Sequence, residues 1–306
     1  MSTADDGRED PRRRGRGDAI VLDNGRLRVT AESFGAELGS LKRSDAPEEY
    51  LWQGDPAWWN RRAPVLFPIV GRLRDDRYTW RGESFSLGQH GFARDRRFTL
   101  VGHDALSARF ELRDDADTRA AYPFAFRLAI EHRLDGESLR SVYEVTNSGG
   151  DELPFSLGAH PGLRCPLIEG EVFEDHVVEF EREETADRHL VVDGLIDRLT
   201  EPLLRRERSL PLRRDLFTRG ALVATALESR RATLRSQRSG RGVELSYPGF
   251  PFFGIWTKPG APFVCLEPWC GIADRIDASG RLEDKAGLIR LAPGATFRRE
   301  ITLRPF

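Results

Sequence analysis

The feature that most constrains this chain is a rhythm of short apolar or alternating segments, separated by glycine, aspartate, asparagine and proline, that continues from Ala19 to the C-terminus. Successive side chains of a β-strand point to opposite faces, so this pattern predicts strands, whereas helical periodicity is scarce. Asp135-Gly136-Glu137, between two long alternating segments, predicts a hairpin because Asp-Gly tolerates positive φ. We therefore expect an all-β fold: a large antiparallel β-sandwich of two packed sheets with few short helices.

The expected strands are spread over the whole chain. They cover residues 19–22, 27–31, 36–42, 98–103, 107–112, 126–134, 138–147, 153–159, 221–227, 232–236, 242–247, 252–257, 263–267, 287–291 and 296–303. A short hairpin is expected around Arg81-Gly82, since large residues alternate on both sides of that turn. The charged segment from Phe180 to Arg214 is predicted to be a long solvated excursion around one or two short strands.

A single domain is expected over residues 19–306, because no internal repeat, low-complexity linker or abrupt change of composition interrupts them. Residues 1–18 contain five acidic and five basic side chains and no apolar core. This composition predicts a disordered N-terminal tail and not a secretory signal.

Charge and cysteine content narrow the possible partners and the compartment. The formal net charge is −2, and no apolar run approaches the roughly 18 residues of a membrane span, so neither nucleic acid nor a membrane is an expected partner. The cysteines, Cys165, Cys265 and Cys270, are few and odd in number. They predict buried thiols without a disulfide framework or a zinc site, and a cytoplasmic location.

Three segments place an ionisable residue beside glycine or proline at the end of an expected strand. His90 lies between Gln89 and Gly91, His160 precedes Pro161-Gly162, and Glu267 precedes Pro268. Histidine and a carboxylate exchange protons near neutral pH when burial adjusts their pKa values. These residue types, without a metal or a reactive thiol, predict proton transfer on a neutral polar substrate such as a sugar.

The same segments resemble the aldose 1-epimerase (mutarotase) family of the galactose mutarotase-like superfamily, and most closely the branch that includes the LacX-type proteins. The resemblance covers residues 19–306, and the first of its motifs places an arginine, Arg72, after an apolar run. Its four motifs are Phe67-Pro68-Ile69-Val70-Gly71-Arg72-Leu73, Gln89-His90-Gly91-Phe92-Ala93-Arg94-Asp95, Ala159-His160-Pro161-Gly162 and Glu267-Pro268-Trp269-Cys270-Gly271-Ile272-Ala273-Asp274. It implies a galactose mutarotase-like supersandwich with a sugar cleft.

The resemblance also implies cofactor-free and metal-free interconversion of the α and β anomers of an aldohexose. Glu267 would be the general base at the anomeric hydroxyl, His160 the general acid at the ring oxygen, and His90 an assisting residue. Arg72 and Arg94 would bind the sugar, and a further side chain, Trp269, would stack on it. Where galactose mutarotases carry a sugar-binding aspartate, this chain reads Phe217-Thr218-Arg219-Gly220-Ala221-Leu222-Val223, which contains none.

Three alternatives follow from the same residues. Arg94 and its basic neighbours would also suit a hexose 6-phosphate, because a guanidinium matches phosphate geometry. The fold could instead serve a carbohydrate-binding or regulatory module without turnover. A thiol hydrolase using Cys265 or Cys270 with His160 is the third alternative, although no sign of thiolate activation is visible. The protein is expected to be a monomer or a homodimer.

Overall fold

Residues 19–306 are described by the structure, a computed structural model, and strands dominate them. The first strands are β1 (Ile20–Asp23), β2 (Leu27–Ala31), β3 (Leu38–Arg43), β4 (Val65–Leu66), β5 (Arg77–Trp80), β6 (Glu83–Ser86), β7 (Thr99–His103), β8 (Ser107–Arg113), β9 (Phe126–Asp135), β10 (Ser138–Asn147) and β11 (Leu153–Phe155). The others are β12 (Leu157–Ala159), β13 (Gly162–Arg164), β14 (His176–Val192), β15 (Leu195–Pro211), β16 (Leu222–Ala224), β17 (Arg231–Ser236), β18 (Gly242–Ser246), β19 (Phe252–Trp256), β20 (Phe263–Cys270), β21 (Ile289–Leu291) and β22 (Thr296–Pro305).

Helices are short, as the sequence predicts. The α-helix is α1 (Ala116–Ala121), and the 3-10 turns are η1 (Arg74–Asp76), η2 (Ala93–Asp95), η3 (Phe173–Asp175), η4 (Arg214–Phe217) and η5 (Leu282–Asp284). None of the helices within residues 19–306 has the length and apolar character needed to cross a membrane. The predicted disordered tail, residues 1–18, lies outside the described residues.

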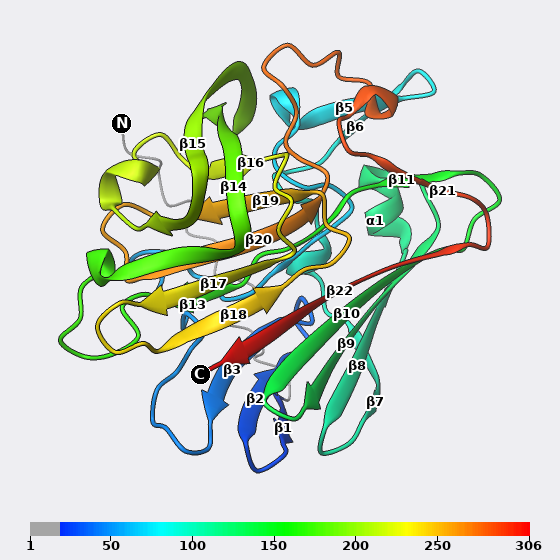
Figure 1. Ribbon diagram of the computed structural model, residues 1–306. Helices are drawn as coiled ribbons and strands as arrows, with labels where there is room; N and C mark the ends of the chain where they lie inside the picture. Colours follow the sequence, from blue (N-terminus) through cyan, green and yellow to red (C-terminus); the bar gives the residue numbers. More distant parts are fainter. Residues whose placement is uncertain (1–18) are drawn as a thin grey trace.

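One 15-stranded sheet forms most of the fold, and Figure 1 shows it running across the molecule. Its main path is β4-β12-β20-β19-β16-β14-β17-β18-β22-β10-β9-β8-β7, while β13 pairs with β20 and β15 with β14. The strand β22 joins the two halves, because Thr302 lies opposite Arg140 of β10 on one side and opposite Ser246 of β18 on the other. The antiparallel all-β prediction is confirmed, although hydrogen bonds connect the expected layers into one continuous sheet.

Smaller sheets complete the architecture. The strands β1, β2 and β3 form a three-stranded sheet, in which β1 contacts β8 and β9, and β11–β21 and β5–β6 form two-stranded ones. A single large cluster of buried hydrophobic residues includes side chains from Leu22 to Leu303. The cysteines are all buried and unpaired, as the sequence predicts.

The prediction for the segment from Phe180 to Arg214 was wrong. Instead of a loop with short strands, the structure has a hairpin of two 17-residue strands, β14 and β15, which rises from the sheet in Figure 1. Its turn is Asp193-Gly194, with φ of 51° and 82°, the positive values that a two-residue hairpin turn requires. Four irregularities of register interrupt the strand pairing, and these disturb the alternation that sequence reasoning depends on.

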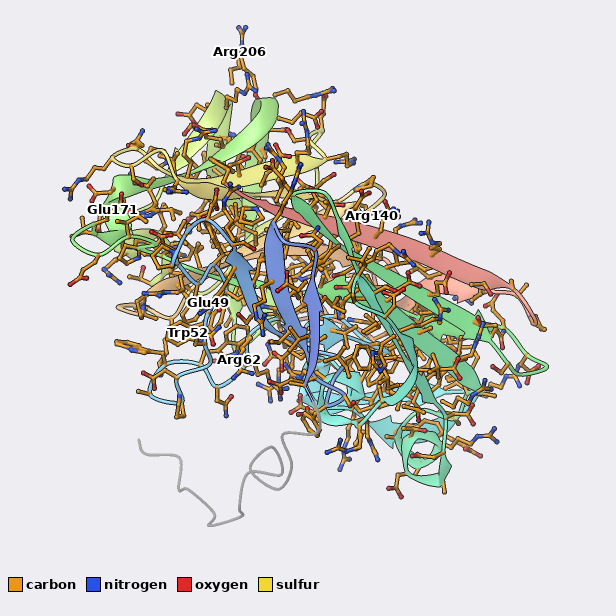
Figure 2. The ribbon with its side chains drawn as sticks, turned by 90° about the horizontal axis from the view of Figure 1, so that it is seen from below. Glu49, Trp52, Arg62, Arg140, Glu171 and Arg206 are labelled. Atoms are coloured by element: carbon orange, nitrogen blue, oxygen red, sulfur yellow. The ribbon has the colours of Figure 1, made fainter. Side chains whose placement is uncertain are left out.

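One face of the hairpin is buried and the other is charged. Figure 2 shows Arg206 of β15 projecting from the hairpin, away from Glu49 and Trp52 on the body of the molecule. The carboxylate of Glu184 in β14 is 2% exposed and accepts hydrogen bonds from the backbone N–H groups of Ser229 at 2.6 Å and Glu228 at 3.1 Å. This carboxylate therefore ties the hairpin to the loop before β17.

Glu184→Ala should lower the free energy of unfolding by about 2 kcal/mol, since two buried N–H groups lose their acceptor. Urea denaturation followed by circular dichroism measures the change. The matched control is Glu183→Ala, because Glu183 is the exposed neighbour in the same strand and should leave the midpoint unchanged. Equal midpoints for both variants would contradict this role of Glu184.

Candidate active site

The strand β20 brings three of its side chains to one face of the sheet. Cys265, Glu267 and Trp269 alternate along it and therefore point the same way. On the neighbouring β19, Gly254 lies opposite Glu267. A Cβ at Gly254 would lie 2.5 Å from the Trp269 ring, so the indole of Trp269 covers the backbone of this glycine. Trp269 thus forms an aromatic floor beside the Glu267 carboxylate.

His160 reaches the same face from the other side of β20. Gly158 of β12 pairs with Trp269, and Pro161 interrupts the chain directly after His160, before β13 begins. The Nε2 atom of His160 lies 3.0 Å from Oε2 of Glu267, and the two side chains are only 8% and 2% exposed. Nδ1 of His160 has no hydrogen-bond partner among the described residues. The position of the imidazole proton is therefore governed mainly by the carboxylate.

Burial favours the uncharged forms of both members of this pair. It lowers the pKa of His160 to about 3, with Arg94 adding to the effect. Burial also raises the pKa of Glu267 well above its usual value. The indole of Trp269 partly opposes this rise in the pKa of Glu267. Its Nε1 has no hydrogen-bond partner among the described residues. In this uncharged state, a neutral imidazole lies beside a neutral carboxylic acid, and one acidic proton serves both groups. We call it the shared proton.

Two tryptophans hold the imidazole of His160 in place. Trp59 stacks on it with ring centroids 4.9 Å apart and an interplanar angle of 28°. Trp256 of β19 contacts it edge-on at 5.8 Å. Sequence reasoning did not identify either residue. The adjacent pair Trp58-Trp59, in a segment rich in turn-forming residues, was the available signal.

His90 is fixed by an unusual backbone. Its φ is 66° and that of Gly91 is 70°, and a Cβ at Gly91 would lie 2.3 Å from the carbonyl oxygen of Phe67. The backbone N–H of Gly71 donates to Nδ1 of His90 at 3.1 Å, so Nε2 carries the proton of the neutral ring. The side-chain amide of Gln89 lies 3.3 Å from this Nε2. Burial, reinforced by Arg94, lowers the pKa of His90 well below its usual value. His90 is therefore a neutral hydrogen-bond donor, 5.7 Å from the ring of His160.

These residues line a cavity of about 440 Å³, which is a suitable size for a monosaccharide. Its lining comprises Trp59, Gly71, Gln89, His90, Arg94, His160, Val191, Gly194, Ile196, Gly220, Ala221, Val223, Trp256, Glu267, Trp269 and Ala273. Arg94 donates from its guanidinium to the carbonyl of Gln89 at 2.6 Å. The structure thus brings five of the six predicted site residues together in one cavity.

Arg72, the sixth, does not belong to this lining. Its guanidinium donates to the two carboxylate oxygens of Asp76 at 2.9 and 2.8 Å, and to the carbonyl of Asp193 at 3.2 Å. Asp193 is in the turn of the β14–β15 hairpin. Arg72 therefore connects the loop after β4 with the hairpin that borders the cavity, and its role as a sugar ligand stays a prediction.

A buried ion pair supports the loops around the cavity. Lys285 donates to Oδ1 of Asp274 at 3.1 Å and to the carbonyl of Ile272 at 2.7 Å. Asp274 in turn donates its N–H to the carbonyl of Arg72 at 2.8 Å and accepts from the N–H of Arg74 at 3.1 Å. This network fixes the end of the fourth motif against the loop that positions His90.

The described residues include one group with donors suited to a metal ion. His160, Cys265 and Glu267 each offer an atom within 4.8 Å of the others. Burial and the neighbouring Glu267 raise the pKa of Cys265 well above its usual value, which keeps the thiol protonated. A protonated thiol is a poor ligand and a poor nucleophile, which weighs against a thiol hydrolase as well.

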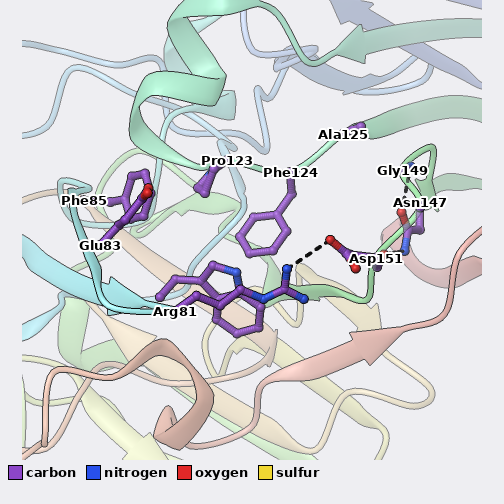
Figure 3. A pocket seen from close by; sticks show the side chains of 11 residues that line it. Arg81, Glu83, Phe85, Pro123, Phe124, Ala125, Asn147, Gly149 and Asp151 are labelled. Atoms are coloured by element: carbon purple, nitrogen blue, oxygen red, sulfur yellow. Dashed lines mark hydrogen bonds and ion pairs between the residues drawn. The ribbon is translucent and has the colours of Figure 1, made fainter.

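Another concavity, of about 290 Å³, has a different character. Figure 3 shows Arg81 reaching Asp151 across it, with Phe124 and Glu83 nearby. This ion pair, at 3.1 Å, is 63% and 69% exposed, so water screens it. The concavity offers no buried acid–base pair among the described residues, and the chemistry is therefore assigned to the cavity around Glu267.

The fold and the buried carboxylate–imidazole pair together define a galactose mutarotase-like protein. A sequence model described as aldose 1-epimerase matches residues 18–304, and the chain belongs to this family. It is 37% identical to the chromosomal LacX protein of Lactococcus lactis subsp. lactis over 290 residues, which cover 92% of this chain and 97% of that protein. The plasmid LacX protein of the same organism matches with the same identity and coverage.

Solved structures agree with this family membership. The galactose mutarotase related enzyme of Lactobacillus acidophilus superposes with a TM-score of 0.91 at 35% identity, covering 94% of this chain and 97% of that one. The galactose mutarotase-like protein of Lactobacillus casei gives a TM-score of 0.89 at 28% identity, with coverage of 94% and 100%. Membership in the family implies an isomerase that acts on a sugar.

The shared proton can be tested directly by nitrogen NMR of histidine-labelled protein. His160 should remain neutral between about pH 8 and pH 5, because its lowered pKa keeps the folded ring unprotonated where an ordinary histidine gains charge. In urea the same residue should titrate near its ordinary value of about 6.5. A His160 resonance that titrates near neutral pH in the folded protein would rule out the dry pair described above.

Proposed function

We propose that the protein interconverts the α and β anomers of an aldose by acid–base opening and closing of the pyranose ring. The distance of 3.0 Å between His160 Nε2 and Glu267 Oε2 inside the cavity carries this proposal. The anomeric hydroxyl O1 and the ring oxygen O5 are bonded to the same carbon, so neighbouring acid and base groups can reach both. Glu267 is the general base at O1 and His160 the general acid at O5.

Ring opening removes one proton from O1 and adds one proton to O5. Glu267 as carboxylate takes the proton of O1–H, the C1–O5 bond breaks as C1=O1 forms, and His160 as imidazolium protonates O5. Rotation about C1–C2 presents the other face of the aldehyde, and the two groups then work in reverse. The protein pair alternates between imidazolium with carboxylate and imidazole with carboxylic acid, and its net charge does not change.

The dry environment favours one of these two states. Burial lowers the pKa of His160 and raises that of Glu267, which stabilises the neutral imidazole and the neutral carboxylic acid. This neutral pair coexists with the open-chain aldehyde, whereas the charged pair coexists with the closed ring. Because the resting pair is neutral, a proton must pass from Glu267 to His160 when the closed sugar binds, and burial favours its return as the ring opens.

The remaining polar groups hold the sugar. The neutral ring of His90 donates from Nε2, because Gly71 occupies its Nδ1. Arg94 and Gln89 add polar atoms to the same part of the lining, and Trp269 offers an aromatic surface on which the C–H face of a pyranose stacks. These residues bind the sugar, and the Glu267–His160 pair exchanges protons with it.

Glu267→Gln should reduce the catalysed rate at least ~100-fold, since it keeps the shape of the side chain and removes the base. Polarimetry, or NMR exchange between anomer signals, measures the rate after subtraction of the uncatalysed reaction. Glu83→Gln, on the rim of the other concavity, is the matched control and should retain full activity. Equal turnover by wild type and Glu267→Gln would support the non-catalytic carbohydrate-binding module instead.

The hexose 6-phosphate alternative rests on Arg94. Among the described residues, it alone brings a guanidinium to the cavity lining, and that guanidinium already donates to Gln89. A phosphate usually engages several charged donors, so a neutral sugar fits better. Glucose should therefore be exchanged with a higher kcat/KM than glucose 6-phosphate. The reverse order, abolished by Arg94→Gln, would establish the phosphorylated substrate.

A further inference from the structure

The acid step of the proposed reaction places a positive charge on His160, and much of its surroundings opposes that charge. Burial, Arg94 and Arg61 each lower the pKa of His160, so each makes the imidazolium less stable. The Nδ1 atom of the ring has no hydrogen-bond partner among the described residues. The carboxylate of Glu267, with Oε2 3.0 Å from Nε2, compensates the charge only until it takes the proton of O1. The imidazolium therefore gains from any further negative potential beside the ring.

Trp59 presents the face of its indole to this imidazole. The two ring centroids are 4.9 Å apart and the planes are inclined by 28°, so the rings are stacked. Trp256, by contrast, meets the same imidazole at 83° and 5.8 Å. The π-electrons give an indole face a negative potential, which attracts a cation within about 6 Å of the ring centroid. Of these two tryptophans, Trp59 is the one that stacks in parallel on His160.

The contact between Trp59 and His160 strengthens when His160 takes up a proton. A neutral imidazole stacked on an indole gains apolar burial and dispersion, whereas an imidazolium gains electrostatic attraction in addition. Exclusion of water increases this attraction, because little solvent is present to screen it. Unlike the carboxylate of Glu267, the indole keeps its negative potential throughout the proton transfer. Trp59 therefore favours the charged form of His160 when the ring oxygen of the sugar needs a proton.

The indole of Trp59 is held in a stack of aromatic rings. Phe263 stacks on it at 5.5 Å and 23°, and Trp52 stacks on Phe263 at 4.9 Å and 29°. The indole N–H of Trp52 donates to the backbone carbonyl of Trp59 at 2.7 Å. A Cβ at Gly162 would lie 2.9 Å from the Trp59 ring, so this glycine, two residues after His160, leaves room for the indole. The stack thus fixes the indole against the imidazole.

Backbone contacts anchor the loop that carries Trp59, which lies between β3 and β4. The N–H groups of Arg62 and Ala63 donate to Oε1 of Glu37 at 2.7 and 2.8 Å, and Glu37 is 8% exposed. The N–H of Trp59 itself donates to the carbonyl of Asp55 at 2.9 Å. None of these bonds uses the indole of Trp59. The backbone of the loop is therefore expected to persist when that side chain is changed.

We propose that Trp59 is a positioning residue for the acid step, which stabilises the imidazolium of His160 through a cation–π contact in addition to orienting the ring. This inference rests on the proposed function, because ring opening requires His160 to donate a proton to O5. It does not depend on how the sugar is oriented in the cavity. A cation–π contact in a water-excluded site favours the charged form by ~10- to 30-fold, and this factor should appear in kcat.

Replacement of the indole tests the proposal through separate effects on kcat and KM. With whichever of D-glucose and D-galactose the wild type exchanges faster, Trp59→Leu should lower kcat ~10- to 30-fold, and Trp59→Phe by a smaller factor. KM should change by less than ~3-fold, because the contact acts on His160 and not on the sugar. Trp58→Leu, in the same loop but outside the cavity lining, is the matched control and should retain the wild-type kcat. A raised KM with unchanged kcat would make Trp59 a sugar platform and overturn the proposal.

Fluorinated tryptophans at position 59 separate the effect of charge from that of shape. Fluorine withdraws electrons from the ring face and weakens a cation–π contact, while the packing of the ring is nearly preserved. Monofluoro, difluoro and tetrafluoro forms of Trp59 should give a logarithm of kcat that falls with each fluorine, by ~10-fold in all. The same series at Trp58 should leave kcat unchanged. A constant kcat across the Trp59 series would overturn the proposal, and this test holds even if Trp59→Leu does not fold.

The outcomes distinguish this inference from the proposed function. If Glu267→Gln exchanges anomers as fast as the wild type, the epimerase function fails and the inference fails with it. If exchange depends on Glu267 while the fluorinated series shows no trend in kcat, the function stands and the proposed role of Trp59 fails.

Discussion

The interaction on which the rest of the site depends is the close contact between a buried imidazole and a buried carboxylate. Its 3.0 Å distance arises from sheet pairing, because Gly158 of β12 lies opposite Trp269 of β20 and so brings the residue after β12 beside Glu267. Two ionisable groups in so dry a place would each be costly alone. Sharing one proton removes the net charge and leaves the pair able to give and take a proton.

Contacts from several surrounding segments hold that pair and its neighbours in position. Trp59 stacks on the imidazole, Trp269 covers the glycine next to the carboxylate, and the buried pair of Lys285 and Asp274 fixes the loop whose Gly71 positions His90. Arg72 connects the same loop to the hairpin turn through Asp193. The cavity is therefore bounded by elements that are far apart in the chain and held together by a few specific contacts.

Much of the candidate site could be predicted from the sequence, because each key residue is followed directly by glycine or proline, although Glu267 lies inside β20 and not at the expected strand end. His90, His160 and Glu267 were identified in this way, and they meet in one cavity. Trp59 carried a weaker signal and was missed. The β14–β15 hairpin, which contributes Val191 and Ile196 to the cavity lining, was also missed, since its irregular register masks the alternation of its strands. Asp193-Gly194 was the available hairpin signal.

The sequence by itself determined the class of fold, the position of most strands and the chemical character of the reacting groups, because these depend on local patterns and on residue types. Only the tertiary structure decided which groups face one another. It placed Arg72 on Asp76 and Asp193 instead of in the cavity lining, set the tautomer of His90 through the N–H of Gly71, and added side chains of the β14–β15 hairpin to the cavity lining. Those outcomes depend on contacts between segments more than a hundred residues apart as well as on local turns, and no local pattern encodes the long-range ones.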